Sequence, residues 1–221
     1  MQSIRSYRPS DRERVREICF ATGYMGEPVD WYWRDARSFA DIWTSWYTDH
    51  EPESCFVADD GGEVVGYLLG CLDSALAPSP RAAVVWQLFK RALWLRPGTA
   101  GFFRRSFRDA LTGGGAPSGE LLDPRWPSHL HINLLPEARG RGLGRGLMEA
   151  WLARLRVLGS PGCHLVTLAE NTRAVAFFQA TGFTPYGEPR TVPGLRLRSG
   201  GRVHQQTFVQ HLTRSRAAAP A

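Results

Sequence analysis

Seven consecutive residues in the second half of the chain combine glycine and arginine in a way that suits phosphate binding. They are Arg139, Gly140, Arg141, Gly142, Leu143, Gly144 and Arg145, and Gly146 follows them. Free N–H groups at a helix N-terminus attract phosphate, glycine lets a ligand approach them, and arginine adds positive charge. Apolar spacing predicts a strand before the segment and a helix after it. The sequence therefore predicts a pyrophosphate site between a strand and a helix.

Two other phosphate motifs do not fit this segment. A dinucleotide fingerprint needs a third glycine where Arg145 stands if it begins at Gly140, and where Leu147 stands if it begins at Gly142. A P-loop needs glycine, lysine and a hydroxyl residue in succession, and the sequence has no such triplet. Both alternatives are excluded by spacing.

The elements that must position the glycine loop follow from hydrophobic periodicity and turn residues. Ser10 and Glu13 have the spacing of a capping box at the start of a helix. Helices are expected over 10–23, 31–47, 82–95, the segment after the glycine loop and 172–181. Strands are expected over 4–8, 54–58, 63–73, 129–135, 163–168, 183–186 and 203–212, with Gly61 and Gly62 turning the hairpin.

The region 74–127 interrupts this pattern with six prolines and the hinge 113–115. We expect a single domain over 1–213 in which 74–127 is a helical and loop insertion, followed by a flexible tail over 214–221. The aromatic residues of 31–47 fit either core and lid packing or one wall of a substrate cleft. The arginines of the insertion fit a solvated helical face better than an acidic ligand.

Composition limits the partners that the chain can have. It has 221 residues with a net charge of +6, so an anionic partner is expected, either nucleic acid or a phosphorylated cofactor. Hydrophobic residues make up 43% of it, which excludes disorder throughout. Four scattered cysteines predict buried thiols and no metal site. Without a long apolar run or a signal-like N-terminus, we expect a cytoplasmic protein with no membrane partner.

The spacing Arg139-x-x-Gly142-x-Gly144, between a predicted strand and a predicted helix, resembles the pyrophosphate loop of the GNAT superfamily of N-acetyltransferases. The resemblance implies an α/β (α+β) fold: a central mixed, mostly antiparallel twisted sheet of about seven strands with helices on both faces. A splayed parallel pair of strands would form the cofactor site. The resemblance also implies acetyl-CoA as cosubstrate, no metal, and an amine as acceptor.

A second segment, about thirty residues downstream, resembles the other signature of the superfamily. It reads Asn171-Thr-Arg-Ala174-Val-Ala-Phe177-Phe178 and is followed by Gly182-Phe183. The resemblance implies that Asn171, Ala174, Phe177 and Phe178 contact the cofactor. It also implies that the backbone of Asn133, Leu134 and Leu135 holds the pantetheine arm and offers an N–H to the thioester oxygen.

Within the superfamily, ESCFVADDGGEVVGYLLGCLDS and SHLHINLLPEARGRGLGRGLM look most like the acetyltransferase-like C-terminal domain of human O-GlcNAcase and its free-standing bacterial relatives. The likeness assigns no acceptor, because the human domain is itself suspected of lacking activity. The arginine-glycine loop is intact in this chain.

Histidine is the natural candidate for the base of such a reaction. An alkylamine has a pKa near ~10.4 and must lose a proton before it attacks. His129, His131 and Asn133 alternate onto one face of the strand 129–135, and His131 is the favoured base. A histidine that is hydrogen-bonded within the sheet is the alternative. Glu120, Asp123 and Glu137 are further candidates.

The general acid of the family is absent from its usual place. A tyrosine four residues after the alanine usually protonates the leaving thiolate, and this position holds Phe178. Tyr186, a serine or an ordered water could replace it. A thiol of pKa ~8.5 leaves tolerably unaided, so transfer would be slowed without being prevented.

Three functions therefore stay open at this stage. The first is N-acetyl transfer from acetyl-CoA to a small-molecule or protein amine, by a monomer or a homodimer. The second is a module that binds acetyl-CoA with little turnover, which Phe178 favours. The third is nucleic-acid binding, suggested by the net charge and by the alternation of arginines and aromatics over 102–107, and it is the least favoured.

Overall fold

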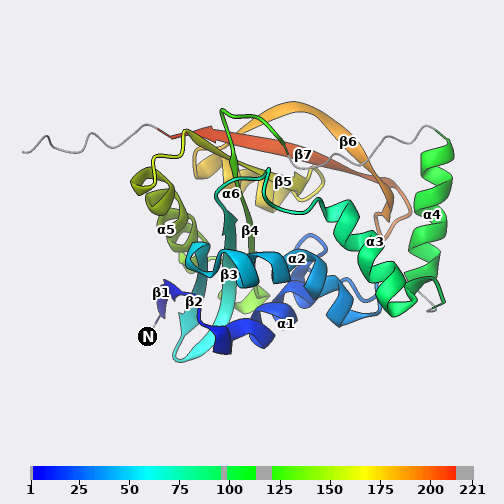
Figure 1. Ribbon diagram of the computed structural model, residues 1–221, viewed down its shortest axis with the longest axis horizontal. Coiled ribbons are helices and arrows are strands. Elements are labelled where there is room, and N and C mark those ends of the chain that lie inside the picture. The colour runs from blue at the N-terminus through cyan, green and yellow to red at the C-terminus, as the bar shows by residue number, and fades with distance from the viewer. Residues whose placement is uncertain (1, 96–98, 113–120, 213–221) are drawn as a thin grey trace, which may run out of the picture.

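A computed structural model describes residues 2–95, 99–112 and 121–212 of the chain (Figure 1). Its centre is a seven-stranded sheet in the order β1-β2-β3-β4-β5-β7-β6. The strands are β1 (Gln2–Ser6), β2 (Cys55–Asp60), β3 (Glu63–Cys71), β4 (Ser128–Leu134), β5 (Gly162–Leu168), β6 (Thr184–Arg196) and β7 (Arg202–His211). Neighbouring strands are antiparallel except β4 and β5, which are parallel. The predicted sheet, with one parallel pair at its centre, is confirmed.

Helices cover both faces of the sheet, as predicted. They are α1 (Arg12–Thr22), α2 (Ala36–His50), α3 (Pro80–Arg91), α4 (Thr99–Leu111), α5 (Leu143–Val157) and α6 (Thr172–Ala180). Short 3-10 turns lie at Pro9–Asp11, Pro52–Ser54, Leu93–Leu95 and Pro136–Ala138. Tyr67 and Leu69 of β3 point into the core beneath α1 and α2, while Leu68 points into the core beneath α5. This alternation gives each face of the sheet its own apolar layer.

Two predicted helices begin later than their periodicity suggested. The aromatic helix predicted over 31–47 is α2, Ala36–His50, because the Asp35 side chain accepts the Ser38 N–H at 2.7 Å and caps the helix there. The helix predicted from Ser10 begins at Arg12, after a 3-10 turn in which Asp11 accepts the Arg8 N–H. The Asp35 side chain thus caps α2, whereas the Asp11 side chain bonds to the turn ahead of α1 and not to the helix itself.

The insertion contains two helices, α3 and α4, drawn at the same end of the molecule in Figure 1. Helix α3 corresponds to the amphipathic stretch predicted over 82–95, and α4 packs along β6. Phe102 and Phe103 of α4 are partly buried and pack against Tyr32 and Trp33 of the core, whereas Phe107 is exposed. The single-domain boundary remains a prediction, and the tail 214–221 and the hinge 113–115 lie outside the described residues.

The thiols lie inside the fold, as predicted. Cys19, Cys55, Cys71 and Cys163 are all buried. Burial raises the pKa of Cys163 to about 12, so its thiol is protonated at neutral pH. The parts of the chain that the structure describes contain no group of three or more histidine, cysteine or acidic residues that could hold a metal ion. None of the described helices is both long and apolar enough to cross a bilayer.

Candidate active site

The parallel strands β4 and β5 separate after a short paired segment. Their backbones pair at Ser128 with Cys163 and at His129 with His164. Beyond that point β4 continues to pair with β3 as far as Leu134, and β5 continues to pair with β7 as far as Leu168. The backbone of 130–134 is therefore paired on one side and open toward β5. The two strands thus form the splayed parallel pair that the resemblance implied.

The amide directions along β4 identify the group that faces this opening. The Leu135 N–H donates to Val65 O at 2.9 Å, so it is already used within the sheet. Because amides alternate in direction along an antiparallel strand, the N–H of Leu134 points to the other side, toward β5. Of the three backbone positions predicted to hold the pantetheine arm, Leu134 therefore offers the accessible amide.

The glycine loop joins the end of β4 to the N-terminus of α5. Gly140 and Gly142 have φ angles of 72° and 83°, a left-handed conformation that favours glycine. Helix α5 begins at Leu143, and its first internal bond runs from the Gly146 N–H to Gly142 O at 3.0 Å. The N–H groups ahead of Gly146 have no helical acceptor, which leaves them available to an anion.

Of the next two glycines, Gly146 is required by packing, whereas a Cβ at Gly144 would make ordinary van der Waals contacts. A Cβ at Gly146 would lie 2.9 Å from the Ile4 side chain, too close for any larger residue. A Cβ at Gly144 would lie 3.5 Å from both Leu134 and Phe177. Gly144 therefore brings the start of α5 near the end of β4 and the side of α6, which places the two sequence signatures together.

The arginines of the loop have three different environments. Arg139 donates to Leu134 O at 2.9 Å and to Gly26 O at 2.7 Å, so its guanidinium ties the end of β4 to the loop after α1. Burial, together with the neighbouring Arg173, lowers its pKa. Arg141 pairs with Asp60 at 2.8 Å, while Arg145 is exposed. Arg139 thus has a structural role that the sequence did not predict.

Helix α6 lies beside the loop with its own cap and an aromatic core face. The Asn171 Oδ1 accepts the Ala174 N–H at 3.3 Å, which leaves the amide nitrogen of Asn171 as the end that can donate to a ligand. Phe177 is partly buried near Gly144. Phe178 is only 6% exposed and packs against Phe183 and Phe208.

His131 and Asn133 lie on the face of β4 that α1 and α2 cover. The His131 ring contacts Trp43 at 5.7 Å and Tyr47 at 5.3 Å between ring centroids, both from α2. The Asn133 amide donates to the Thr22 hydroxyl at 2.6 Å. Two of the three predicted catalytic side chains are thus two positions apart on one strand.

A buried hydrogen-bonded chain runs beneath His131 and was not predicted. Ser74 Oγ lies 2.7 Å from Pro127 O and 2.7 Å from His129 Nδ1. Because a carbonyl only accepts, Ser74 gives its proton to Pro127 O and accepts the Nδ1–H of His129. His129 Nε2 is then an acceptor for the Tyr47 hydroxyl, 2.7 Å away. The sequence signal was the alternation of His129 with His131, but its partners come from distant segments.

The remaining candidates lie elsewhere. Tyr186 is on β6, three strand positions or ~14 Å from β4, where its ring packs on Trp126 and its hydroxyl accepts from Arg125. Hydrogen bonding to Arg125 lowers the pKa of Asp123 to about 2, so this carboxylate is ionised at neutral pH and a weak base. Glu137 is exposed in the turn before the loop. Glu120 lies outside the described residues.

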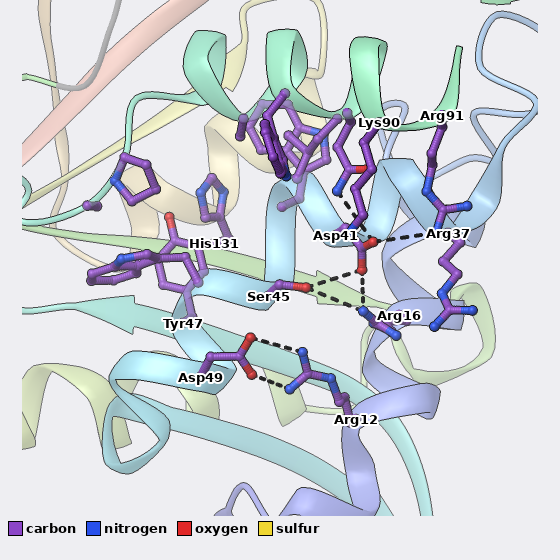
Figure 2. Close-up of a pocket in the computed structure, with 18 residues that line it drawn as sticks. Arg12, Arg16, Arg37, Asp41, Ser45, Tyr47, Asp49, Lys90, Arg91 and His131 are labelled. Carbon is purple, nitrogen blue, oxygen red and sulfur yellow. Dashed lines mark hydrogen bonds and ion pairs between the residues drawn. The ribbon is translucent and has the colours of Figure 1, made fainter. Parts of the chain in front are cut away.

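A pocket of about 420 Å³ opens between α2 and α3, with His131 and Tyr47 at one end (Figure 2). Trp43 and Trp46 of α2 line it, whereas Trp33 and Phe39 are buried in the core. The aromatic segment thus packs in the core at Trp33 and Phe39 and lines a pocket at Trp43 and Trp46, and the use of this pocket as a substrate cleft stays a prediction. The sequence did not predict that the insertion would supply the opposite wall.

Comparison with known proteins agrees with this geometry. The profile of the Acetyltransferase (GNAT) family matches residues 20–183. A mycothiol acetyltransferase from Geodermatophilus obscurus is 35% identical over 95 residues, a match that spans 41% of this chain but only 30% of that protein. The similarity to this relative therefore covers less than a third of its length.

Solved structures extend the likeness over nearly the whole chain. A protein named SsHAT is 30% identical, with a TM-score of 0.65 over 93% of this chain and 96% of its own. A Salmonella typhimurium protein solved with its cofactor acetyl-CoA shares the fold at 16% identity, with a TM-score of 0.55 over 100% of this chain and 98% of its own. The profile match and the likeness to SsHAT cover the separated strands, the glycine loop and α6 together. The chain belongs to the GNAT family of acetyltransferases.

Proposed function

We propose that this chain transfers an acetyl group from acetyl-CoA to the amine of a small molecule or protein. The observation that carries the proposal is the opening between β4 and β5 directly beside the free amides of the glycine loop. The residues present fit the cosubstrate, because Gly140 and Gly142 leave open space where a side chain would otherwise stand over the loop. Mycothiol acetyltransferase, the named activity of one relative, supports the same reaction class.

The reaction would proceed by direct attack. The amine nitrogen forms a bond to the thioester carbon, the carbon–sulfur bond breaks, and coenzyme A leaves as a thiolate that takes up a proton. The Leu134 N–H would stabilise the negative charge that develops on the carbonyl oxygen. His131 would accept the proton of the amine, with Asn133 beside it to orient the acceptor. The Asn171 amide and the faces of Ala174 and Phe177 would hold the pantetheine arm.

Protonation of the thiolate is the step with the weakest support in this chain. The Phe178 ring cannot donate a proton, and it packs within the core. Tyr186 would have to act from two strands beyond β5. A water molecule, or solvent at the open end of the strands, fits this proton transfer better than either side chain.

Phe178 also favours a second candidate function, a module that binds acetyl-CoA with little turnover. One assay separates the two functions. The full chain is incubated with acetyl-CoA and a panel of amines, free thiol is followed with a thiol reagent, and the amide product is identified by mass spectrometry. Thiol release that depends on the amine supports the enzyme. Tight binding of acetyl-CoA without thiol release from any amine supports the module.

The finer assignments are also proposals. The cytoplasm supplies acetyl-CoA and keeps thiols reduced, which suits a chain with buried cysteines, so we propose that location. The resemblance to the acetyltransferase-like domain of O-GlcNAcase stays a prediction, as does the choice between a monomer and a homodimer. Nucleic acid remains the least favoured partner, because two of the three aromatic rings in 102–107, Phe102 and Phe103, pack against the core.

A further inference from the structure

The pocket between α2 and α3 has a surplus of positive charge. Five basic side chains line it, Arg12, Arg16, Arg37, Lys90 and Arg91, against the two carboxylates of Asp41 and Asp49. Arg12 pairs with Asp49, and Arg16 pairs with Asp41. Arg91 approaches Asp41 at 3.9 Å and the nearby Asp35 at 3.6 Å. The carboxylates in the pocket are therefore already paired.

Two of the cations are left to face the solvent of the pocket. Arg37 and Lys90 are exposed, and neither forms an ion pair with any residue in the ranges 2–95, 99–112 and 121–212. Placing several like charges around one concave space raises its potential and attracts anions. The pairing pattern makes this an excess charge that a ligand can neutralise.

The cations and the candidate base stand at different ends of the pocket. Figure 2 shows His131 and Tyr47 at one end and Arg37 and Arg91 at the other. The rings of Trp43, which contacts His131, and Trp86 also line the pocket. A ligand that spans the pocket would thus meet the candidate base and aromatic surface toward one end and positive charge at the other end.

We propose that this pocket binds the amine acceptor, and that the acceptor carries a carboxylate or phosphate separated from its amino group by an apolar spacer. This rests on the proposed N-acetyltransferase function and names the substrate class of the same site. The positive charge disfavours diamines and polyamines, which would place a second cation beside Arg37 and Lys90. It also disfavours the ammonium form of any acceptor, which increases the fraction of neutral amine that can attack.

The test compares acceptors that match in length and differ in charge. Thiol release is measured with 6-aminohexanoate, hexylamine and cadaverine, and then with O-phosphoethanolamine and ethanolamine to separate phosphate from carboxylate. We expect kcat/KM to be highest for an anionic member and lowest for cadaverine. The double variant Arg37→Gln with Lys90→Gln should lower kcat/KM for the preferred anionic acceptor about tenfold and change kcat/KM for hexylamine much less. Both side chains are exposed, so the variant should fold normally.

The control is Arg156→Gln, which removes one positive charge from α5 on the opposite face of the sheet. If hexylamine and cadaverine react as well as both anionic acceptors, the anion proposal is wrong while the N-acetyltransferase stands. If no amine releases thiol, the proposed function fails, and calorimetry then tests whether the pocket prefers an anionic ligand. In that case 6-acetamidohexanoate should bind the protein saturated with coenzyme A more tightly than N-hexylacetamide does, and equal affinities would overturn the pocket proposal.

Discussion

His131 is the single residue whose removal tests the chemistry most directly. It lies on β4, contacts the rings of Trp43 and Tyr47, and lines one end of the pocket. We expect His131→Gln to lower kcat at pH 7 by about 10² to 10⁴-fold, because the amine then loses its proton acceptor. Part of the loss should be recovered above pH 9, where more of the free amine is already neutral. Rates measured between pH 6 and 10 check both statements.

His50→Gln is the matched control for this variant. His50 is an exposed histidine at the end of α2, where it bonds the Trp46 carbonyl. Its replacement should leave the pH profile unchanged. A His131 variant with the profile of the parent protein would show that another group, or water, removes the proton.

The burial of the Phe178 ring leads to a prediction about stability. The ring is 6% exposed and packs between Phe183 and Phe208. A hydroxyl added by Phe178→Tyr would be buried among apolar rings, so the free energy of unfolding should fall by about 1 to 3 kcal/mol in a denaturant titration. Phe177→Tyr, at a partly buried position, should cost less. A Phe178→Tyr protein that is fully stable and releases thiol faster would instead place this position at the leaving sulfur.

Local spacing predicted the glycine loop, the alternation of His131 with Asn133 on β4, and the signature that begins at Asn171, because each lies within one short segment. It did not predict the Tyr47–His129–Ser74 chain, whose bonded members are 55 and 82 positions apart in the sequence. Local spacing also identified Arg139 as a source of positive charge for phosphate. It gave no sign that the Arg139 guanidinium donates to the Gly26 carbonyl, 113 positions away. Residue types can be read in sequence, but the hydrogen-bond partners that decide their roles come from the fold.

At the scale of elements, the loop between β4 and α5 depends on the left-handed conformation of Gly142. Alanine at this position would strain the backbone by about 1 to 2 kcal/mol, although its Cβ would meet open space. We expect Gly142→Ala to weaken acetyl-CoA binding by about tenfold or more, because the amides at the start of α5 would shift. Calorimetric titration of acetyl-CoA measures the change.

Gly61→Ala separates loop geometry from general destabilisation. Gly61 turns the β2–β3 hairpin with a φ angle of 68°, and its Cβ would also meet open space. Its replacement should cost similar stability and leave acetyl-CoA affinity unchanged. Equal losses of affinity in both variants would mean that global stability, and not the loop, controls binding.

Most elements were predictable because their periodicity is local, and the exceptions have a common cause. The N-terminus of α2 was placed too early because Trp31 and Trp33 continue an apolar pattern, whereas the Asp35 cap determines the boundary. Helix α4 was not predicted as a separate helix. Its inner face packs on β6, which comes about eighty residues later in the chain. An insertion that packs on a later strand gives little sign of that contact in its own sequence.

At the scale of the whole molecule, one buried ion pair joins the insertion to the sheet. Asp109 of α4 accepts two bonds from Arg196 at the end of β6, at 2.6 and 2.7 Å, and a third from the Gly194 N–H at 2.8 Å. The Arg196 hydrogen bonds lower the pKa of Asp109 to about 2 from an ordinary value of 3.8. The carboxylate side chain is 4% exposed, so solvent screens this pair little.

This pKa shift predicts how stability depends on pH. Because the folded-state pKa lies below the unfolded value, the pair stabilises the fold above pH 3.8. The contribution, about 2 kcal/mol, should be lost as the pH falls through 3.8 toward 2. Asp109→Asn should therefore be much less stable than the parent at pH 6, and the difference should narrow by about that amount near pH 2. Denaturant unfolding of both proteins between pH 2 and 6 measures it.

Asp123 has a similarly lowered pKa but a more exposed partner. Comparing its variant with the Asp109 variant therefore isolates the effect of burial on stability. Hydrogen bonding to Arg125 lowers its pKa to a similar value of about 2, but the Arg125 side chain is 56% exposed. Salt and water screen such a pair, so Asp123→Asn should change the pH dependence less than Asp109→Asn, and added salt should reduce its effect further. If Asp109→Asn shows as little pH dependence as an exposed pair would give, the docking of α4 on β6 depends on apolar packing at Phe102 and Phe103 and not on the ion pair. The insertion that forms one wall of the acceptor pocket would then keep its place at acidic pH.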